Sequence, residues 1–206
     1  MRSRLLLSTV GATLATGLAL GCSDSNGPAD DSRPPAELTV LRLAETSPPL
    51  FNPEQSFWAV RGEDRETRIF FQNETGGAGE EYLRLRVDAP SLQAYPDGTP
   101  FGIDDSVLIT VRVVDPAQLL FELEPSGLRF NALVPAELKI HYDQADDDLD
   151  EDGDVDLEDE ALELTLSIWR QELPGDPFVR IGGIVLDDLE EIEAELEGFS
   201  RYALAY

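Results

Sequence analysis

Glu81-Tyr82-Leu83-Arg84-Leu85-Arg86-Val87 is the stretch of the chain that decides its fold. Its two leucines and its valine recur at every second position, and arginine fills the places between them. Successive side chains of an extended strand point to opposite faces of a sheet. We therefore expect a strand with one buried apolar face and two arginines that face water or an acidic neighbour.

The same alternation recurs in short segments on both sides, separated by residues that favour turns, as at Pro96-Asp-Gly-Thr-Pro100. Between Leu38 and Leu43 the buried face of a first strand stays ambiguous. The segments expected to be strands are Phe57–Val60, Thr67–Phe71, Ser106–Val114, Leu119–Leu123, Ala136–Tyr142, Leu162–Ile168, Phe178–Leu186, Ile192–Leu196 and Phe199–Tyr206. This pattern predicts an all-β chain, folded as a single antiparallel β-sandwich of generally immunoglobulin-like architecture.

Two of these assignments depend on local detail. Arg61-Gly-Glu-Asp64 lies between Phe57–Val60 and Thr67–Phe71, and its glycine favours a hairpin between these two strands. The segment from Glu190 to Leu196 also fits a helical face. Its strict alternation of glutamate with apolar residues favours a strand.

An acidic loop from Asp148 to Asp159 interrupts the strands and reads Asp-Leu-Asp-Glu-Asp-Gly-Asp-Val-Asp-Leu-Glu-Asp. EF-hand calcium loops place oxygen ligands at positions 1, 3, 5, 7, 9 and 12, with glycine at position 6. Gly153 stands at that turn, and Val155 is expected to pin the loop by a backbone pairing or a core contact. The ligands expected for Ca²⁺ are Asp148, Asp150, Asp152, Asp154 through its backbone carbonyl, Asp156 often through water, and Asp159.

The loop also resembles the calcium loops of bacterial dockerin repeats, which often end in aspartate. It departs from them because it occurs once, and because the residues after it alternate like a strand, with one helical turn at most over Leu157–Ala161. Asp159 is one methylene shorter than the usual glutamate, so we expect a dissociation constant of about 10⁻⁵ to 10⁻³ M, as in extracellular modules. The alternative is a solvated acidic crossover between two strands.

The amino-terminal segment predicts export and lipid anchoring. Residues 1–21 have a basic start, an apolar core and small residues at the end, as in a secretory signal peptide. Leu18-Ala-Leu-Gly-Cys22 resembles the bacterial lipobox, which implies a lipid on Cys22 and a membrane as partner. Residues 22–35 are then an acylated cysteine and a disordered tether, and residues 36–206 form the sandwich with the calcium loop at 148–159. Ser23 favours the outer membrane of the bacterial envelope over the inner one.

The formal net charge of -27 restricts the partners that we expect. Such a charge repels nucleic acid and favours divalent cations and basic partners. Cys22 is the sole cysteine, so no disulfide can form within the chain.

Several segments are similar to the β-sandwich domain shared by zonula-occludens proteins, netrin receptors and ankyrins. They are Asp105–Val113, Glu124–Phe130, Pro135–Ile140 and Ile192–Tyr202. The resemblance implies a sandwich over Phe57 to Tyr206. Some relatives cut themselves within a His-Phe-Ser motif, but this chain has Gly198-Phe-Ser200, so we expect core packing by Phe199 and Tyr202 instead.

The sequence predicts no catalytic constellation. His141 is its one histidine and is expected on a strand surface, and there is no phosphate-binding glycine loop or nucleophile elbow. The aromatic residues Phe57, Trp58, Trp169 and Phe178 are expected in the core, with a carbohydrate or peptide surface as the alternative. The preferred hypothesis is a non-catalytic, calcium-stabilised binding, adhesion or structural module with an unidentified protein or glycan partner. The alternative is a metal-dependent hydrolase of an envelope polymer that uses the acidic loop.

Overall fold

The computed structural model describes residues 31–186 and 189–206. The predicted signal peptide and Cys22 lie outside the described residues. The described fold begins at β1 (Ser32–Arg33), which pairs with β11, so it starts earlier than the boundary at residue 36. A 3-10 turn over Pro35–Glu37 follows.

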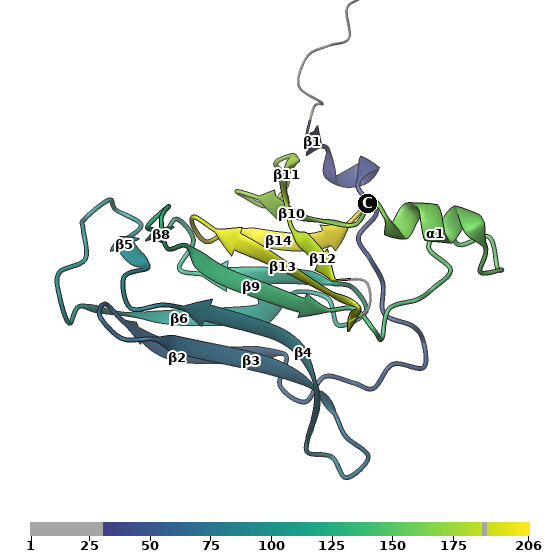
Figure 1. Ribbon diagram of the computed structural model, residues 1–206, viewed down its shortest axis with the longest axis horizontal. Helices are drawn as coiled ribbons and strands as arrows, with labels where there is room; N and C mark the ends of the chain where they lie inside the picture. The colour runs from purple at the N-terminus through teal and green to yellow at the C-terminus, as the bar shows by residue number, and fades with distance from the viewer. Residues whose placement is uncertain (1–30, 187–188) are drawn as a thin grey trace, which may run out of the picture. The chain divides into compact units, whose positions relative to one another are not determined.

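The described residues form an all-β, sandwich-like fold with antiparallel sheets, as predicted (Figure 1). The order of the seven-stranded sheet is β1, β11 (Phe178–Gly182), β10 (Ser167–Gln171), β14 (Arg201–Ala205), β7 (Leu120–Glu124), β6 (Ser106–Val113) and β2 (Glu54–Val60). The five-stranded sheet has the order β12 (Ile184–Leu186), β13 (Glu191–Leu196), β9 (Ala136–His141), β4 (Ala78–Val87) and β3 (Arg65–Gln72). A small pair joins β5 (Leu92–Ala94) to β8 (Arg129–Phe130).

The core lies between the inner faces of the two large sheets. Leu83, Leu85 and Val87 of β4 are at most 1% exposed, and the arginines between them are on the outer face. Alternate residues of β6, β9 and β13 are buried in the same way. The alternation in the sequence therefore assigned the two faces of these strands correctly.

Most of the aromatic residues expected in the core are buried, but one is exposed. Phe199 and Tyr202 are buried, as predicted, and the Tyr202 hydroxyl donates to the carbonyl of Gly198 four residues earlier. Trp169 and Phe178 are also buried, in a smaller cluster, and Phe57 packs partly buried against the main core. For Trp58 the prediction of a core position is wrong, because its side chain is 59% exposed on the outer face of β2.

The prediction of a hairpin between Phe57–Val60 and Thr67–Phe71 is wrong. β2 pairs with β6 and β3 pairs with β4, so Arg61–Asp64 carries the chain from one sheet to the other. Gly62 does adopt a left-handed conformation with φ +104°. However, the Gly62 amide donates to the carbonyl of Ala89, and the Arg61 amide donates to the carbonyl of Asp105. These two hydrogen bonds attach the connection to other segments.

The strand expected over Phe178–Leu186 is two strands in different sheets. Gly182 and Gly183 have φ values of +86° and +152°, and between them the chain turns from β11 into β12. A Cβ on Gly183 would lie 2.7 Å from a side-chain carbon of Ile192. Glycine is therefore required both by the backbone conformation and by the close packing.

The segment Leu162–Ile168 is also not one strand. A helix, α1 (Leu157–Glu163), fills its first part, and β10 begins only at Ser167. Asp156 and Asp159 form a reciprocal capping box at the start of α1. This local signal, followed by good helix formers, outweighs the alternation of leucines, and Leu164 remains 79% exposed.

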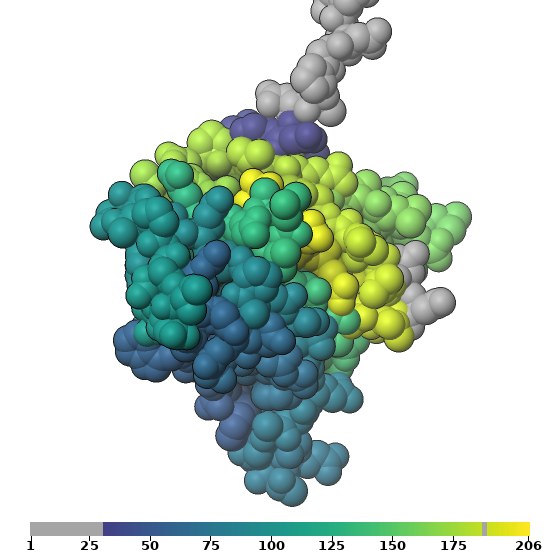
Figure 2. All heavy atoms as spheres, turned by 60° about the vertical axis from the view of Figure 1, so that its left-hand side comes forward, coloured from purple at the N-terminus to yellow at the C-terminus, as the bar shows by residue number. Residues whose placement is uncertain are grey.

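The β3–β4 connection projects from the body of the sandwich (Figures 1 and 2). It contains Asn73-Glu-Thr75, which the side-chain oxygen of Asn73 organises by accepting from the amides of Thr75 and Gly77 at 3.0 and 2.9 Å. The segment is thus an ordered polar turn.

Candidate metal centre

The acidic loop follows β9 and includes the first turn of α1, and together with α1 it connects the five-stranded sheet to β10 of the seven-stranded one. The structure brings three of its predicted ligands together. One carboxylate oxygen from each of Asp148, Asp150 and Asp152 lies within 4.8 Å of the other two. This group of oxygens could hold a metal ion.

Backbone amides of the loop hold these carboxylates in place. The amide of Asp152 donates to Asp148 and to Asp150, at 3.1 Å in both cases. The Gly153 amide donates to the second oxygen of Asp148 at 3.0 Å, and the Asp154 amide donates to Asp152 at 3.1 Å. Gly153 has φ +100°, which allows its amide to point back at position 1 of the loop.

Asp159 closes the loop through the backbone. Its Oδ1 accepts from the amides of Leu149 and Asp150 at 2.7 and 3.2 Å, and its Oδ2 accepts from Asp156 at 2.8 Å. The side chain is buried. The hydrogen bond from the Asp156 amide, together with those from the other two amides, lowers the pKa of Asp159 below its usual value. Asp159 thus clamps the two ends of the loop together, and the structure does not place it in the cluster of three.

The carboxylates of the remaining predicted ligands lie outside that cluster, and ligation by the backbone carbonyl of Asp154 stays a prediction. Asp156 is the N-cap of α1, and its Oδ1 accepts from the amide of Glu158 at 2.7 Å. Asp154 is exposed. Val155 is 64% exposed, so the expected core contact of this residue is wrong.

The surroundings of Asp150 disfavour the ionised form of its carboxyl group. Partial burial, and then the neighbouring charges of Asp152, Asp159 and Asp148, raise the pKa of Asp150 above its usual value, against a hydrogen bond from the Asp152 amide. A bound cation would remove this repulsion. Carboxylate oxygens of this kind suit hard cations such as Ca²⁺ and Mg²⁺, whereas zinc sites usually include nitrogen or sulfur ligands.

Two contacts that the sequence did not predict attach the loop to distant segments. Glu151 forms an ion pair with Arg42 at 2.6 Å, and the hydroxyl of Tyr206 donates to the carbonyl of Leu149. Burial raises the pKa of Tyr206. The loop is therefore attached to the segments at both ends of the described fold.

A cavity of about 130 Å³ lies between the loop, α1 and the sandwich. Apolar side chains such as Leu41, Leu149 and Leu166 line it together with several carboxylates, among them Asp146 and Glu160. None of the three clustered aspartates lines this cavity.

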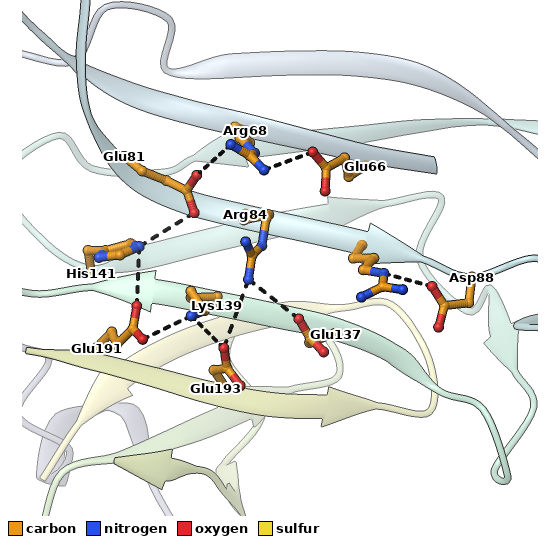
Figure 3. Close-up of polar contacts among 11 residues, drawn as sticks. Glu66, Arg68, Glu81, Arg84, Asp88, Glu137, Lys139, His141, Glu191 and Glu193 are labelled. Atoms are coloured by element: carbon orange, nitrogen blue, oxygen red, sulfur yellow. Dashed lines mark hydrogen bonds and ion pairs between the residues drawn. The ribbon is translucent and has the colours of Figure 1, made fainter. Parts of the chain in front are cut away.

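The outer face of the five-stranded sheet carries a second charged group (Figure 3). Lys139 and His141, the only lysine and the only histidine of the chain, lie on β9 and both contact Glu191 of β13, at 2.9 and 3.6 Å. His141 also lies 3.4 Å from Glu81, and Arg84 lies 3.7 Å from Glu137. This is the strand surface expected for His141, and it supplies the acidic neighbours expected for the β4 arginines.

Burial alone would lower the pKa of Lys139, but its hydrogen bonds to Glu193 and Glu191 outweigh that effect and raise it. The lysine is therefore a charged structural partner and not an activated nucleophile.

No helix among the described residues is both long enough and apolar enough to cross a membrane. No family model, no curated protein and no solved structure matches this chain.

Proposed function

We propose that the chain is a non-catalytic module of the bacterial envelope whose sandwich is stabilised by one calcium ion in the acidic loop. The observation that carries this proposal is the convergence of oxygens from Asp148, Asp150 and Asp152. These residues stand at positions 1, 3 and 5 of a sequence with the spacing of a calcium loop.

Calcium fits this loop better than magnesium does. The clustered carboxylates of the loop lie mostly on the surface, and calcium accepts six to eight oxygens in irregular geometry. Magnesium demands a near-ideal octahedron and gives up its waters reluctantly. The shorter aspartate at position 12 is already engaged by three amides, which supports weak binding over tight binding.

A structural role for the ion is supported by what the loop contacts. A cation that neutralises the cluster would fix Leu149 and Glu151, which are bonded to Tyr206 and Arg42. Binding energy would then stabilise the folded state by mass action. A catalytic role has less support, because the cavity of about 130 Å³ beside the loop is lined by none of the clustered aspartates, and the one lined by Asp148 holds only about 20 Å³.

The location and the partner are proposed from the sequence. A lipid on Cys22 would anchor the sandwich to the envelope, with the outer membrane favoured. The charge of -27 favours a protein or glycan partner over nucleic acid. The resemblance to the domain of zonula-occludens proteins, netrin receptors and ankyrins stays a proposal about the type of sandwich.

Thermal unfolding of the full chain, purified in detergent, tests the calcium proposal. Calcium at 5 mM should raise the melting temperature of the wild type by roughly 4–10 °C over that in chelator. The variant Asp152→Asn should lose most of this rise. Asp147→Asn, an exposed position just before the loop, is the matched control and should keep it. Equal rises in all three proteins would contradict the proposal.

A further inference from the structure

The sandwich has an uncovered strand edge at the end of β13. On one side β13 pairs with β9 along its whole length, from Glu191 to Leu196. On the other side β12 pairs only with its first half, up to Glu193. The chain enters β12 from the other sheet at Gly183, so no described strand other than β9 pairs with the edge from Ala194 to Leu196.

Two hollows lie beside this edge. One has a volume of about 410 Å³ and the other about 270 Å³, and both are lined by Ile181, Glu195 and Glu197. The larger one extends over Ile184 and the Pro135 segment, and the smaller one extends toward Tyr202 of the other sheet. The uncovered edge therefore has open space beside it.

The charge beside the edge is negative and unbalanced. Glu195 and Glu197 are exposed and form no ion pair with any described residue. Arg170, the one cation among the residues that line these two hollows, is already paired with Glu172. Two other glutamates of the same sheet do form ion pairs: Glu137 with Arg84, and Glu193 with Lys139 (Figure 3).

The apolar side chains beside the edge are exposed as well. Ile184 is 68% exposed and Ile181 is 37% exposed, and Leu133, next to a further hollow lined by Glu195, is 90% exposed. An added strand would place alternate side chains on opposite faces. One set would meet Glu195 on the outer face, and the other set would meet Leu196 and Ile181 in the hollow that extends toward Tyr202.

We propose that this edge binds an extended polypeptide segment in which basic and apolar residues alternate, by addition of a strand to β13. Backbone hydrogen bonds along the edge supply affinity, and the two glutamates and the isoleucines supply specificity. A second copy of this chain is a poor occupant, because its charge of -27 would oppose association. The inference does not depend on calcium.

The test is fluorescence anisotropy with the full chain in detergent and in chelator, at low salt. The probe is a labelled, end-blocked peptide of sequence Thr-Arg-Val-Arg-Val-Arg-Thr, and the expected dissociation constant is on the order of 10⁻⁴ M. The double variant Glu195→Gln/Glu197→Gln should weaken binding about fivefold to tenfold. Glu74→Gln/Glu80→Gln, which removes two exposed charges elsewhere, should leave it unchanged.

A second peptide separates strand addition from simple charge attraction. With alternate amides N-methylated, it keeps its charge but cannot extend a ladder, and it should bind at least tenfold more weakly. Equal binding of the two peptides, equal binding by the glutamine variant, or no saturable binding would overturn the proposal. A dimer of the chain alone would also overturn the proposal if the arginine peptide dissociated it. That result would show that a second copy of the chain occupies the edge.

Discussion

The hydroxyl of Tyr206 donates a hydrogen bond to the backbone carbonyl of Leu149, so a residue just after β14 holds the first turn of the acidic loop. Leu149 receives a second restraint on its amide, from the buried carboxylate of Asp159. One residue of the loop is thus fixed at both of its backbone polar groups. If calcium orders this loop, the stability of the sandwich and the occupancy of the ion must be coupled through this residue.

Replacement Tyr206→Phe tests this coupling. The variant loses one hydrogen bond, so the free energy of unfolding in chelator should fall by about 1 kcal/mol. The calcium-dependent rise in melting temperature should also shrink. Tyr95→Phe is the control, since the Tyr95 hydroxyl bonds the Ser106 carbonyl away from the loop. A calcium effect that is the same in both variants would argue against coupling through Leu149.

Replacement Asp150→Asn should have opposite effects with and without calcium. Asparagine keeps an oxygen for the amide of Asp152 but removes one of the mutually repelling charges. The melting temperature in chelator should rise by roughly 1–3 °C, whereas the rise on adding calcium should fall by at least half. Paired melts in chelator and in calcium decide the matter. A variant that is destabilised in both conditions would show that Asp150 has a role other than holding a cation.

The clamp of Asp159 predicts a dependence on pH. Its pKa is lowered in the folded state, so its contribution is complete above the usual value of 3.8 and is lost as the pH falls through the lower folded value. Asp159→Asn should remove the part of that contribution that depends on the charge at every pH, and its one acceptor oxygen cannot serve the Leu149 and Asp156 amides together. Hydrogen exchange of the Leu149 and Asp156 amides should become at least tenfold faster in this variant at pH 6. Exchange that remains as slow as in Glu158→Gln, the neighbouring control, would count against the clamp.

Lys139 should contribute more to the free energy of unfolding than an ordinary surface lysine does. Lys139→Met removes a cation from Glu191, which is only 5% exposed, and should cost about 1–3 kcal/mol of unfolding free energy. Because the pKa of Lys139 is raised, its contribution is present below the usual value of 10.5 and is lost as the pH rises through the higher folded value. Denaturant unfolding at pH 7 measures the cost. Adding Glu191→Gln should recover part of it, and a double variant less stable than Lys139→Met would contradict this pairing.

The sequence predicted the buried and exposed faces of β4, β9 and β13 because alternation along a strand is a local property. It did not predict which strands pair. The connection at Gly62 has the residues of a hairpin turn, but its amides are bonded to Ala89 and Asp105, which are distant in sequence. Partner choice is decided by such long-range contacts.

In the acidic loop, too, the sequence predicted local features but not the contacts with distant residues. Its spacing predicted the three aspartates that the structure brings together. The spacing did not predict that Asp159 would bond three amides, or that a capping box would extend the turn after it into α1. Nor does any local pattern indicate Tyr206 or Arg42, whose contacts with the loop join residues far apart in the chain.

Calorimetric titration of calcium into the full chain, purified in detergent, tests the central claim most directly. The account predicts saturable binding of one ion per chain, with a dissociation constant of about 10⁻⁵ to 10⁻³ M, and no binding heat in Asp148→Asn/Asp152→Asn. Absence of saturable heat at several millimolar calcium would contradict it. Unchanged binding in the double variant would do so equally, and would leave the loop as a solvated crossover between the two sheets.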